Sequence, residues 1–411
     1  MKSKTLSEWL THIESFHPAE IELGLERVRA IATKLQLLTF AGKVIIVGGT
    51  NGKGSCVAVL ESLARAQGLS TGVYTSPHLL KFNERIRLNG NDVKESQLVA
   101  AFESIEAIRD NQPLTFFEFT TLAALSVFQQ AQPDLIVLEV GLGGRLDAVN
   151  ITEPDLSIIT TIAIDHTDWL GDSLEKIAFE KAGIARQGKI TLTGDTKSYT
   201  LLKAQANTQK VDLRQVNLFN DSFDREIEEP KHNPYRLLKQ NILLAKEAFE
   251  LLFPGHIINL RKVLQNVDIK GRFQELKLPV TTIVDVAHNP QSAQNLVVQI
   301  ASYKRSQQNA RVYAICGMMA DKAIIDVLTI MDEVIDEWRF VDLDLPRAIK
   351  AEDLADLYAR SQLTKPTEIA VNVESAYQNC ASKCTAMDMI LVFGSFITVA
   401  DMLQYQLAIQ E

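Results

Sequence analysis

The chain has 411 residues, enough for two or three domains with separate hydrophobic cores. Its hydrophobic content of 46% and charged content of 23% are typical of soluble globular proteins. The formal net charge of -9 argues against broad electrostatic binding to nucleic acid or to an anionic membrane. No apolar run approaches the roughly 20 residues of a membrane span, and the first residues, "MKSKTLSEWLTHIESF", contain no apolar signal core. We therefore expect a cytoplasmic protein without nucleic-acid or membrane partners.

The first half of the chain alternates short β-branched runs with helical patterns. The expected strands are "VIIV" at 44, "TGVYT" at 71, "LIVLEV" at 135, "LSIITTI" at 156 and "KITLT" at 189. The segments 56–67, 96–109 and 120–131 place apolar residues at spacings of three and four, as helices do. Strands that are apolar on both faces and joined by helices predict a parallel α/β sheet. The alternation around Asn89 and Gly90 predicts a small β-hairpin beside it.

The second half repeats this alternation after an interruption. Residues 205–236 are polar and patternless and are interpreted as a surface excursion, after which helical patterns return at 235–252 and 261–267. A fresh α/β series then opens with the expected strands "TTIVDV", "RVYAICG", "EWRFVDL" and "DMILVF". We expect a first domain over residues 1–270, a linker over 271–279 and a smaller Rossmann-like α/β domain over 280–411.

The segment "GGTNGKGS" directly follows the expected strand at 44. Glycines allow backbone N–H groups to converge on phosphate oxygens, and the following helix adds its positive end. Lys53 would neutralise the phosphates of a nucleotide, although Gly54 separates it from Ser55, the hydroxyl that usually reaches the metal. A glycine-rich turn without a ligand is the alternative. We favour a phosphate-binding loop.

Because Gly54 intervenes, a metal would need oxygen ligands from other strand ends. Ser76 follows the expected strand at 71 and Glu139 closes the strand at 135, so both would lie at the carboxyl edge of the sheet. Magnesium favours such hard oxygen ligands with water completing its shell. Ser76 could equally be a turn residue before Pro77. Glu139 lies within an apolar strand, and a purely structural role is harder to assign to it, because burying an unpaired carboxylate is costly.

Two further clusters follow strand ends. "IDHTDWLG" supplies Asp165, His166 and Asp168, and "FEKAGI" adds Lys181, for which an ordinary solvated helix lysine is the alternative. "DVAHNP" ends the strand at 281 and supplies Asp285 and His288. There the alternative is a turn that begins the next helix. These clusters are candidates for metal and nucleotide binding.

Together these motifs resemble the folylpolyglutamate synthase family, which includes bifunctional bacterial dihydrofolate synthases and is related to the Mur peptidoglycan ligases. The resemblance covers nearly the whole chain. It rests on "GTNGKGS", "TSPHL", "NERIRLNG", "FFEFTTLAAL", "EVGLGGRLDAVN", "DHTDWLG", "EKAGI", "GRFQ", "DVAHNP" and "GSF" in this order. It implies an α/β protein with a Mur-ligase-like P-loop ATPase domain carrying folate-binding loops, followed by a Rossmann-like ligase domain. Gly-Lys-Gly-Ser is this family's own form of the loop.

The resemblance implies an ATP-dependent carboxylate–amine ligase that joins L-glutamate to dihydropteroate and to the tail of reduced folates through an acyl phosphate. It implies the catalytic residues Lys53, Lys181 and His288, and the ATP-binding residues Thr50, Asn51, Gly52, Lys53, Gly54, Ser55, Asn241, Arg272 and Asp285. The implied metal ligands are Ser76, Glu139, His166 and Lys181, the last as a carbamate. The implied substrate-binding residues are Glu22, Leu23, Gly24, Leu25, Thr115, Phe116, Phe117, Glu118, Leu146, Asp147 and Ala148.

The implied cofactor is Mg²⁺, expected as two ions, with a monovalent cation as a further candidate, and we expect a monomer. Phe116 and Phe117 would stack on a ring and Glu118 would accept pterin N–H donors, with core packing as the alternative for the two phenylalanines. Three other functions stay open. They are a monofunctional folylpolyglutamate synthase, a Mur-type ligase acting on a UDP-linked peptide, and a P-loop switch that hydrolyses nucleotide without making a product.

Overall fold

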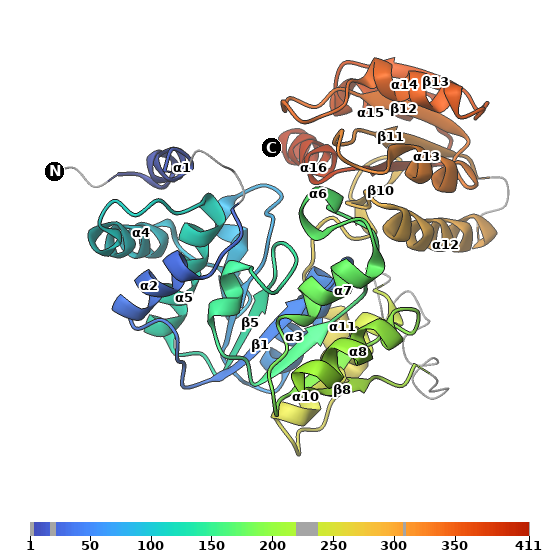
Figure 1. Ribbon diagram of the computed structural model, residues 1–411. Coiled ribbons are helices and arrows are strands. Elements are labelled where there is room, and N and C mark those ends of the chain that lie inside the picture. The colour runs from blue at the N-terminus through green and yellow to red at the C-terminus, as the bar shows by residue number, and fades with distance from the viewer. Residues whose placement is uncertain (1–3, 17–21, 219–236, 307–309, 411) are drawn as a thin grey trace. The chain divides into compact units, whose positions relative to one another are not determined.

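The computed structural model describes residues 4–16, 22–218, 237–306 and 310–410. The chain forms two compact units, which we call the first and second units, and they meet in the sequence between Asp268 and Ile269. The segment 271–279, expected as a linker, lies in the second unit and contains a strand of its sheet. Figure 1 colours both units from the N-terminus to the C-terminus.

The first unit is built on an eight-stranded sheet of order β4-β3-β2-β5-β1-β6-β7-β8. Its strands are β1 (Lys43–Gly48), β2 (Thr71–Tyr74), β3 (Ile86–Leu88), β4 (Asn91–Asp92), β5 (Leu135–Glu139), β6 (Leu156–Ile159), β7 (Ile190–Thr193) and β8 (Asp212–Gln215). All neighbours pair in parallel except at β3, which is antiparallel to both β2 and β4. The predicted parallel sheet is confirmed, and so is the predicted hairpin. Asn89 and Gly90 both have positive φ, as its two-residue turn requires.

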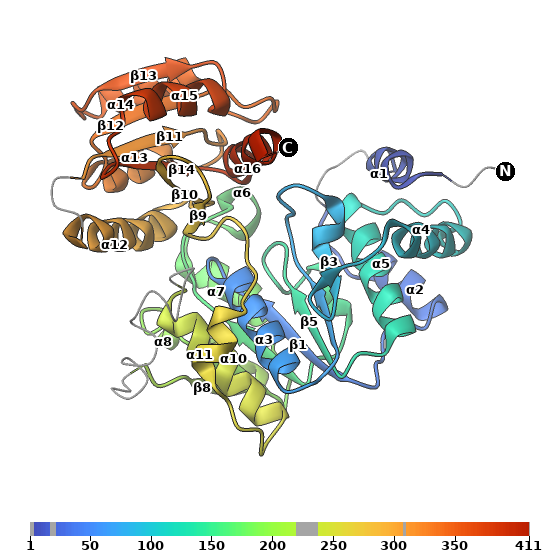
Figure 2. The ribbon, with the colours of Figure 1, turned by 180° about the vertical axis from the view of Figure 1, so that it is seen from behind.

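Helices cover both faces of this sheet. They are α1 (Leu6–Glu14), α2 (Glu26–Lys34), α3 (Lys53–Ala66), α4 (Glu95–Arg109), α5 (Phe116–Ala131), α6 (Thr167–Leu170), α7 (Leu174–Ala182), α8 (Tyr199–Gln209), α10 (Lys239–Leu252) and α11 (Leu260–Gln265), with 3-10 turns η1 (Phe82–Arg85) and η2 (Ala148–Ile151). Helix α3 packs between the sheet and the pair α10 and α11, and Figure 2 shows these three helices together. On the other face α5 packs on β2, and α1, α2 and α4 pack on α5.

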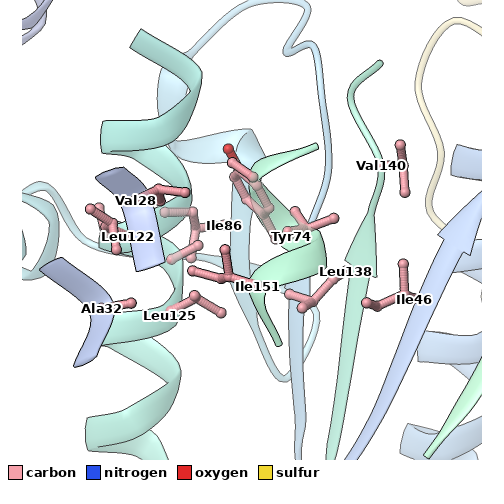
Figure 3. Close-up of a cluster of buried hydrophobic side chains, with 14 of the residues drawn as sticks. Val28, Ala32, Ile46, Tyr74, Ile86, Leu122, Leu125, Leu138, Val140 and Ile151 are labelled. Carbon is pink, nitrogen blue, oxygen red and sulfur yellow. The ribbon is translucent and has the colours of Figure 1, made fainter. Parts of the chain in front are cut away.

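The core of the first unit lies between the sheet and α5. Figure 3 shows Leu125 of α5 pointing toward Ile151 and the strands that carry Tyr74 and Leu138, while Leu122 lies on the side of α5 next to Val28 of α2. Each of these six side chains is at most 1% exposed. Burial of these strands on both faces explains their continuous apolar sequence. The parallel strands thus end together at one edge of a rigid layer, which is where the candidate site begins.

The second unit is a smaller three-layer α/β structure with a sheet of order β13-β12-β11-β14-β10-β9. Its strands are β9 (Gln274–Leu276), β10 (Thr281–Asp285), β11 (Val312–Cys316), β12 (Glu337–Val341), β13 (Thr367–Ala370) and β14 (Met389–Phe393). Its helices are α12 (Pro290–Ser306), α13 (Ile324–Asp332), α14 (Ala351–Arg360), α15 (Val373–Lys383) and α16 (Phe396–Gln410). Only β9 pairs antiparallel with its neighbour. The predicted α/β fold class is confirmed for both units.

The structure corrects the interpretation of residues 205–236 as far as it describes them. Up to residue 218 they continue α8 and form β8, while residues 219–236 lie outside the described ranges. Strand β8 was missed because it is an edge strand in which only Leu213 is buried. The edge strand β13, which is mostly exposed, escaped prediction for the same reason. No helix in the described part of the chain combines the length and apolar character that a bilayer crossing requires.

We predict that Leu125→Ala lowers the free energy of unfolding by about 2–5 kcal/mol, because it leaves a cavity in the core of the first unit. Urea unfolding followed by circular dichroism measures this change. Ile257→Ala, at a side chain that is 90% exposed in the same unit, is the matched control and should change the free energy by less than about 0.5 kcal/mol. Equal effects of the two changes would contradict the assignment of this core.

Candidate active site

The loop between β1 and α3 is shaped by glycines at two close approaches. Gly52 adopts φ 90° immediately before α3, and a Cβ there would lie 2.6 Å from the Asn241 amide oxygen. Gly49 adopts φ 133°, and a Cβ there would lie 1.9 Å from the Thr160 hydroxyl oxygen. Larger residues would be both strained and obstructed. Glycines therefore leave the loop backbone uncovered by side chains. Helix α3 begins directly after the loop, so the positive end of its dipole lies there.

Two threonines after β6 hold this loop in position. The Thr160 hydroxyl donates to the Asn51 carbonyl at 2.7 Å, and the Thr161 hydroxyl accepts from the Asn51 N–H at 3.0 Å. The backbone N–H of Thr50 donates to the Thr161 carbonyl at 2.7 Å. The Thr50 hydroxyl in turn accepts from the N–H of Ala163 at 3.0 Å. The phosphate loop is thus bonded to the neighbouring strand end on both its backbone and its side chains.

Two lysine side chains meet at the carbonyl oxygen of Gly49. Lys53 Nζ donates to it at 3.0 Å and Lys181 Nζ at 3.1 Å. Lys181 is 5% exposed at the end of α7, so it is not a solvated helix lysine. Burial, together with the nearby charge of Lys53, lowers the pKa of Lys181 to about 7, although Asp165 and Asp147 act against this shift. Much of this amine is therefore neutral near pH 7.

The acid of the expected metal site lies directly beside this loop. Glu139 ends β5, is 5% exposed, and pairs in register with Val47 just before the loop. The Ser76 N–H donates to a Glu139 carboxylate oxygen at 3.4 Å, which brings Ser76 to the same point. His166 lies at the exposed N-terminus of α6, where its own N–H donates to Asp165.

A hard divalent cation suits these donors. Within the described ranges no three His, Cys, Asp or Glu side chains gather as a metal cluster. A site that relies on one carboxylate, a hydroxyl and water fits magnesium-like ions, which keep several waters and need one or two carboxylates. The buried Glu139 carboxylate beside Ser76 supplies that minimum.

The expected substrate-binding residues lie in three segments: before α2, at the start of α5 and around the start of η2. Thr115 caps α5, and Phe116 and Phe117 follow it, half-buried and packed on the core. Core packing is thus part of their role. The Glu118 carboxylate is buried and accepts from the Thr115 N–H at 2.8 Å and from Arg27 Nε at 2.8 Å. Glu118 is therefore engaged within the protein, and its expected role as an acceptor for pterin N–H donors stays a prediction.

Asp147 is similarly engaged by the backbone around it. Its carboxylate accepts from the N–H groups of Gly141, Leu142 and Val149 at 2.9–3.0 Å. Burial raises the pKa of Asp147 to about 6, against these hydrogen bonds. Ala148 next to it is buried and Leu146 half-buried. Asp147 thus shapes the loop after β5. Leu23, Gly24 and Leu25 are half-buried before α2.

The second unit brings two of the expected residues, Arg272 and His288, to Phe396. The Arg272 guanidinium lies 5.3 Å from the Phe396 ring centroid, and the His288 ring lies 6.4 Å from it. Asp285 accepts from the N–H groups of Phe273 and Ala287, both at 2.8 Å. Burial raises the pKa of Asp285, while Arg272 lowers it. Asn289, by contrast, bonds to the N–H of Ser292 and forms the turn that begins α12.

Sequence reasoning missed several polar residues at this site. Thr160 and Thr161 lie within the expected strand at 156, and Arg27 lies just after the segment 22–25, yet only their hydrogen bonds reveal their roles. The pair Arg85 and His78 was also missed: Arg85 Nε donates to His78 Nδ1 at 2.8 Å. The usable signal was a charged or hydroxyl residue inside an otherwise apolar segment.

A parallel sheet with a phosphate loop, a lysine pair and a buried acid at its carboxyl edge defines a P-loop enzyme that acts on phosphate groups. Residues 47–235 match the Mur ligase middle domain, and residues 271–396 match the Mur ligase glutamate ligase domain. The class is therefore that of the Mur-type ligases.

Comparison with related proteins identifies the family within this class. The dihydrofolate synthase/folylpolyglutamate synthase of Haemophilus influenzae is 38% identical over 429 residues, which cover 96% of each chain. Escherichia coli FolC in complex with DHPP and ADP has a TM-score of 0.91 and 35% identity, over 100% of this chain and 99% of its own. The bifunctional folylpolyglutamate synthase/dihydrofolate synthase of Yersinia pestis, complexed with AMPPNP and Mn ion, has a TM-score of 0.87 and 35% identity over the same shares. The chain belongs to the dihydrofolate synthase/folylpolyglutamate synthase family and is a carbon–nitrogen ligase.

We predict that Thr160→Val weakens nucleotide binding roughly tenfold, because the Asn51 carbonyl loses the shorter of its two hydroxyl donors, at 2.7 Å, and keeps only Thr161 at 3.1 Å, which loosens the loop. Calorimetric titration with ADP measures this change. Thr191→Val is the matched control, since this buried threonine of the neighbouring strand β7 has a hydroxyl without a hydrogen-bond partner in the described structure. Unchanged ADP affinity in Thr160→Val would show that the hydroxyl does not organise the loop.

Proposed function

We propose that this protein uses ATP to join L-glutamate to 7,8-dihydropteroate, making dihydrofolate, and to the glutamyl tail of reduced folates. One observation carries the proposal: Lys53 and Lys181 converge on the Gly49 carbonyl of the phosphate loop, while the register of β5 on β1 puts Glu139 beside the same loop. This arrangement suits transfer of a phosphoryl group to a carboxylate at the edge of the sheet. Family membership supports the choice of substrates.

The chemistry follows from the weakness of a carboxylate as an electrophile. Phosphorylation would convert it to an acyl phosphate, which the amine of glutamate then attacks with release of phosphate. Thr50 to Ser55 would bind the ATP phosphates through backbone N–H groups, and Lys53 would turn from the loop carbonyls to the phosphates. Positioning and charge compensation are the main requirements of such a transfer.

The Yersinia pestis enzyme is complexed with Mn ion, and for this chain we propose Mg²⁺ as two ions, which Ser76, Glu139, His166 and a carbamate of Lys181 would hold. Such ions supply positive charge to the phosphates when bound. A monovalent cation is a further candidate. Asn241, whose amide lies against Gly52, would contact ATP from the first unit, and Arg272 and Asp285 from the second. His288 would lie near the reacting groups.

We assign ATP and folate binding to the first domain, residues 1–270, and glutamate ligation to the C-terminal domain, residues 280–411. The folate side would use residues 22–25, 115–118 and 146–148, with Phe116 and Phe117 offering ring faces. We propose that the enzyme works as a monomer. A cytoplasmic location stays a prediction.

We predict that the purified protein releases ADP with dihydropteroate plus glutamate and, separately, with a reduced folate plus glutamate. A coupled ADP assay across pteroates, folates and UDP-muramyl acceptors measures this. Lys53→Ala should abolish turnover with little change in thermal midpoint, and Lys43→Ala, an exposed lysine at the start of β1, is the control. Activity with folates alone would leave a monofunctional enzyme. ADP release that is independent of glutamate would favour the nucleotide switch.

We predict that Lys181 carries a carbamate. With a pKa of about 7, roughly three quarters of this amine is neutral at about pH 7.5, against about one part in a thousand for an ordinary lysine. The neutral amine is the form that adds CO₂, and the adduct offers anionic oxygens of the kind that magnesium prefers. Protein equilibrated with ¹³CO₂ should show a carbamate carbon in its NMR spectrum.

This signal should vanish in Lys181→Ala, whose activity should be nearly lost and partly restored by acetate. Lys176→Ala changes an exposed lysine of the same helix and should keep both signal and activity. A fully active Lys181→Ala would refute the carbamate.

A further inference from the structure

Arg27 joins two separate parts of the proposed folate side. It lies in the first turn of α2, and its side chain is only 16% exposed. Its Nε donates to both oxygens of Glu118, at 2.8 and 2.9 Å. Its Nη2 donates to the Glu22 carbonyl at 2.7 Å, and its Nη1 bonds to the Glu22 carboxylate. One guanidinium therefore fastens the segment before α2 to the first turn of α5.

The partner on α5 is Glu118, and Arg27 is the cation that pairs with it in the described residues. Glu118 is 3% exposed, and its remaining hydrogen bonds come from the N–H and hydroxyl of Thr115. A carboxylate offers about four acceptor positions, and Arg27 and Thr115 occupy most of them. Loss of the arginine would leave a buried, uncompensated charge at the base of the Phe116–Phe117 turn. The geometry of that turn thus depends on Arg27.

We propose that Arg27 is a positioning residue that fixes the pterin end of the substrate and favours the shorter substrate, dihydropteroate. The inference rests on the proposed function. Arg27 acts through Glu118, which directly follows the half-buried Phe116 and Phe117 in α5, and through the segment that begins at Glu22. Arg27 thereby fixes the distance between the segment before α2 and the first turn of α5. This distance would determine how deeply a flat ring can bind.

The two substrates differ in how far they reach. The reacting carboxylate of dihydropteroate is attached directly to a benzoate ring, and only the short methylene-amino linker to the pterin can rotate to compensate for a displaced pterin. A glutamylated folate carries its reacting carboxylate on rotatable bonds and can compensate for a misplaced ring. Because a displacement of about 1 Å can cost about a hundredfold in rate, a loosened pocket should penalise the less flexible substrate more.

Only arginine satisfies all these contacts. Its planar fork binds a carboxylate through parallel N–H groups and still has a donor for a carbonyl, whereas lysine offers a single point charge. Arg27→Lys should therefore keep a positive charge beside Glu118 but lose the forked hydrogen bonds. Arg27→Met should remove both the charge and these hydrogen bonds. Arg29→Met is the matched control, since Arg29 lies in the same helix and has no ion pair in the described residues.

The test measures kcat and KM for dihydropteroate and for a reduced folate in the intact enzyme and its variants. We expect Arg27→Met to lower kcat/KM at least about tenfold more for dihydropteroate than for the folate, with KM for ATP unchanged. Arg27→Lys should shift the ratio in the same direction by less. Arg29→Met should leave the ratio unchanged. Added ethylguanidinium should restore part of the dihydropteroate rate in Arg27→Ala.

A second measurement separates positioning from general stability. If Arg27 acts through Glu118, Arg27→Met in a Glu118→Gln background should change the ratio less than it does alone. Equal losses with both acceptors, or a raised KM for ATP, would assign Arg27 a merely structural role and overturn the inference. A wild-type enzyme that is inactive on dihydropteroate would instead refute the proposed dual function, and the inference with it.

Discussion

The carbonyl oxygen of Gly49 is the point around which the first unit's site is organised. The side chains of Lys53 and Lys181 both donate to this one acceptor, and Lys181 is buried there. Burial and the charge of Lys53 disfavour a second ammonium group and lower the pKa of Lys181, although Asp165 and Asp147 act against this shift. Such a site gains most when an anion arrives, because the anion offsets the charge of Lys53 and replaces a weak carbonyl partner. The same constraint thus accounts for the loop geometry and for its preference for phosphate.

Most of the polar side chains described for the candidate site form hydrogen bonds within the protein. Asp147 bonds three backbone N–H groups, Thr160 and Thr161 bond Asn51, and Glu118 is shared by Arg27 and Thr115. Irregular loops at the end of a sheet expose backbone donors and acceptors that no strand satisfies, so buried side chains must do so. Catalytic precision at this edge depends on that supporting layer as much as on the residues that would touch substrate.

The sequence was sufficient for the main strands and for the loop, because both are encoded locally. Continuous β-branched runs predicted β1, β2, β5, β6 and β7, and the glycine spacing predicted the turn into α3. The edge strands β8 and β13 were not predictable, since they bury too few side chains to leave a pattern. For the site, sequence named Glu139 and Lys181 but could not foresee that Glu118 is neutralised by Arg27, 91 residues away. Pairings of this kind depend on tertiary structure alone.

A single enzyme that serves both a less flexible and a more flexible acceptor faces opposing demands. The phosphate side must be fixed, because the transferred group and its charges are the same in both reactions. The acceptor side must place two carboxylates of different reach at that fixed position. The first unit bonds the phosphate loop directly to the threonines after β6, and one guanidinium joins the segment before α2 to the first turn of α5. If these two segments bind the pterin as we propose, their fixed separation would position the less flexible substrate, while a longer one could adjust by rotation of its own tail.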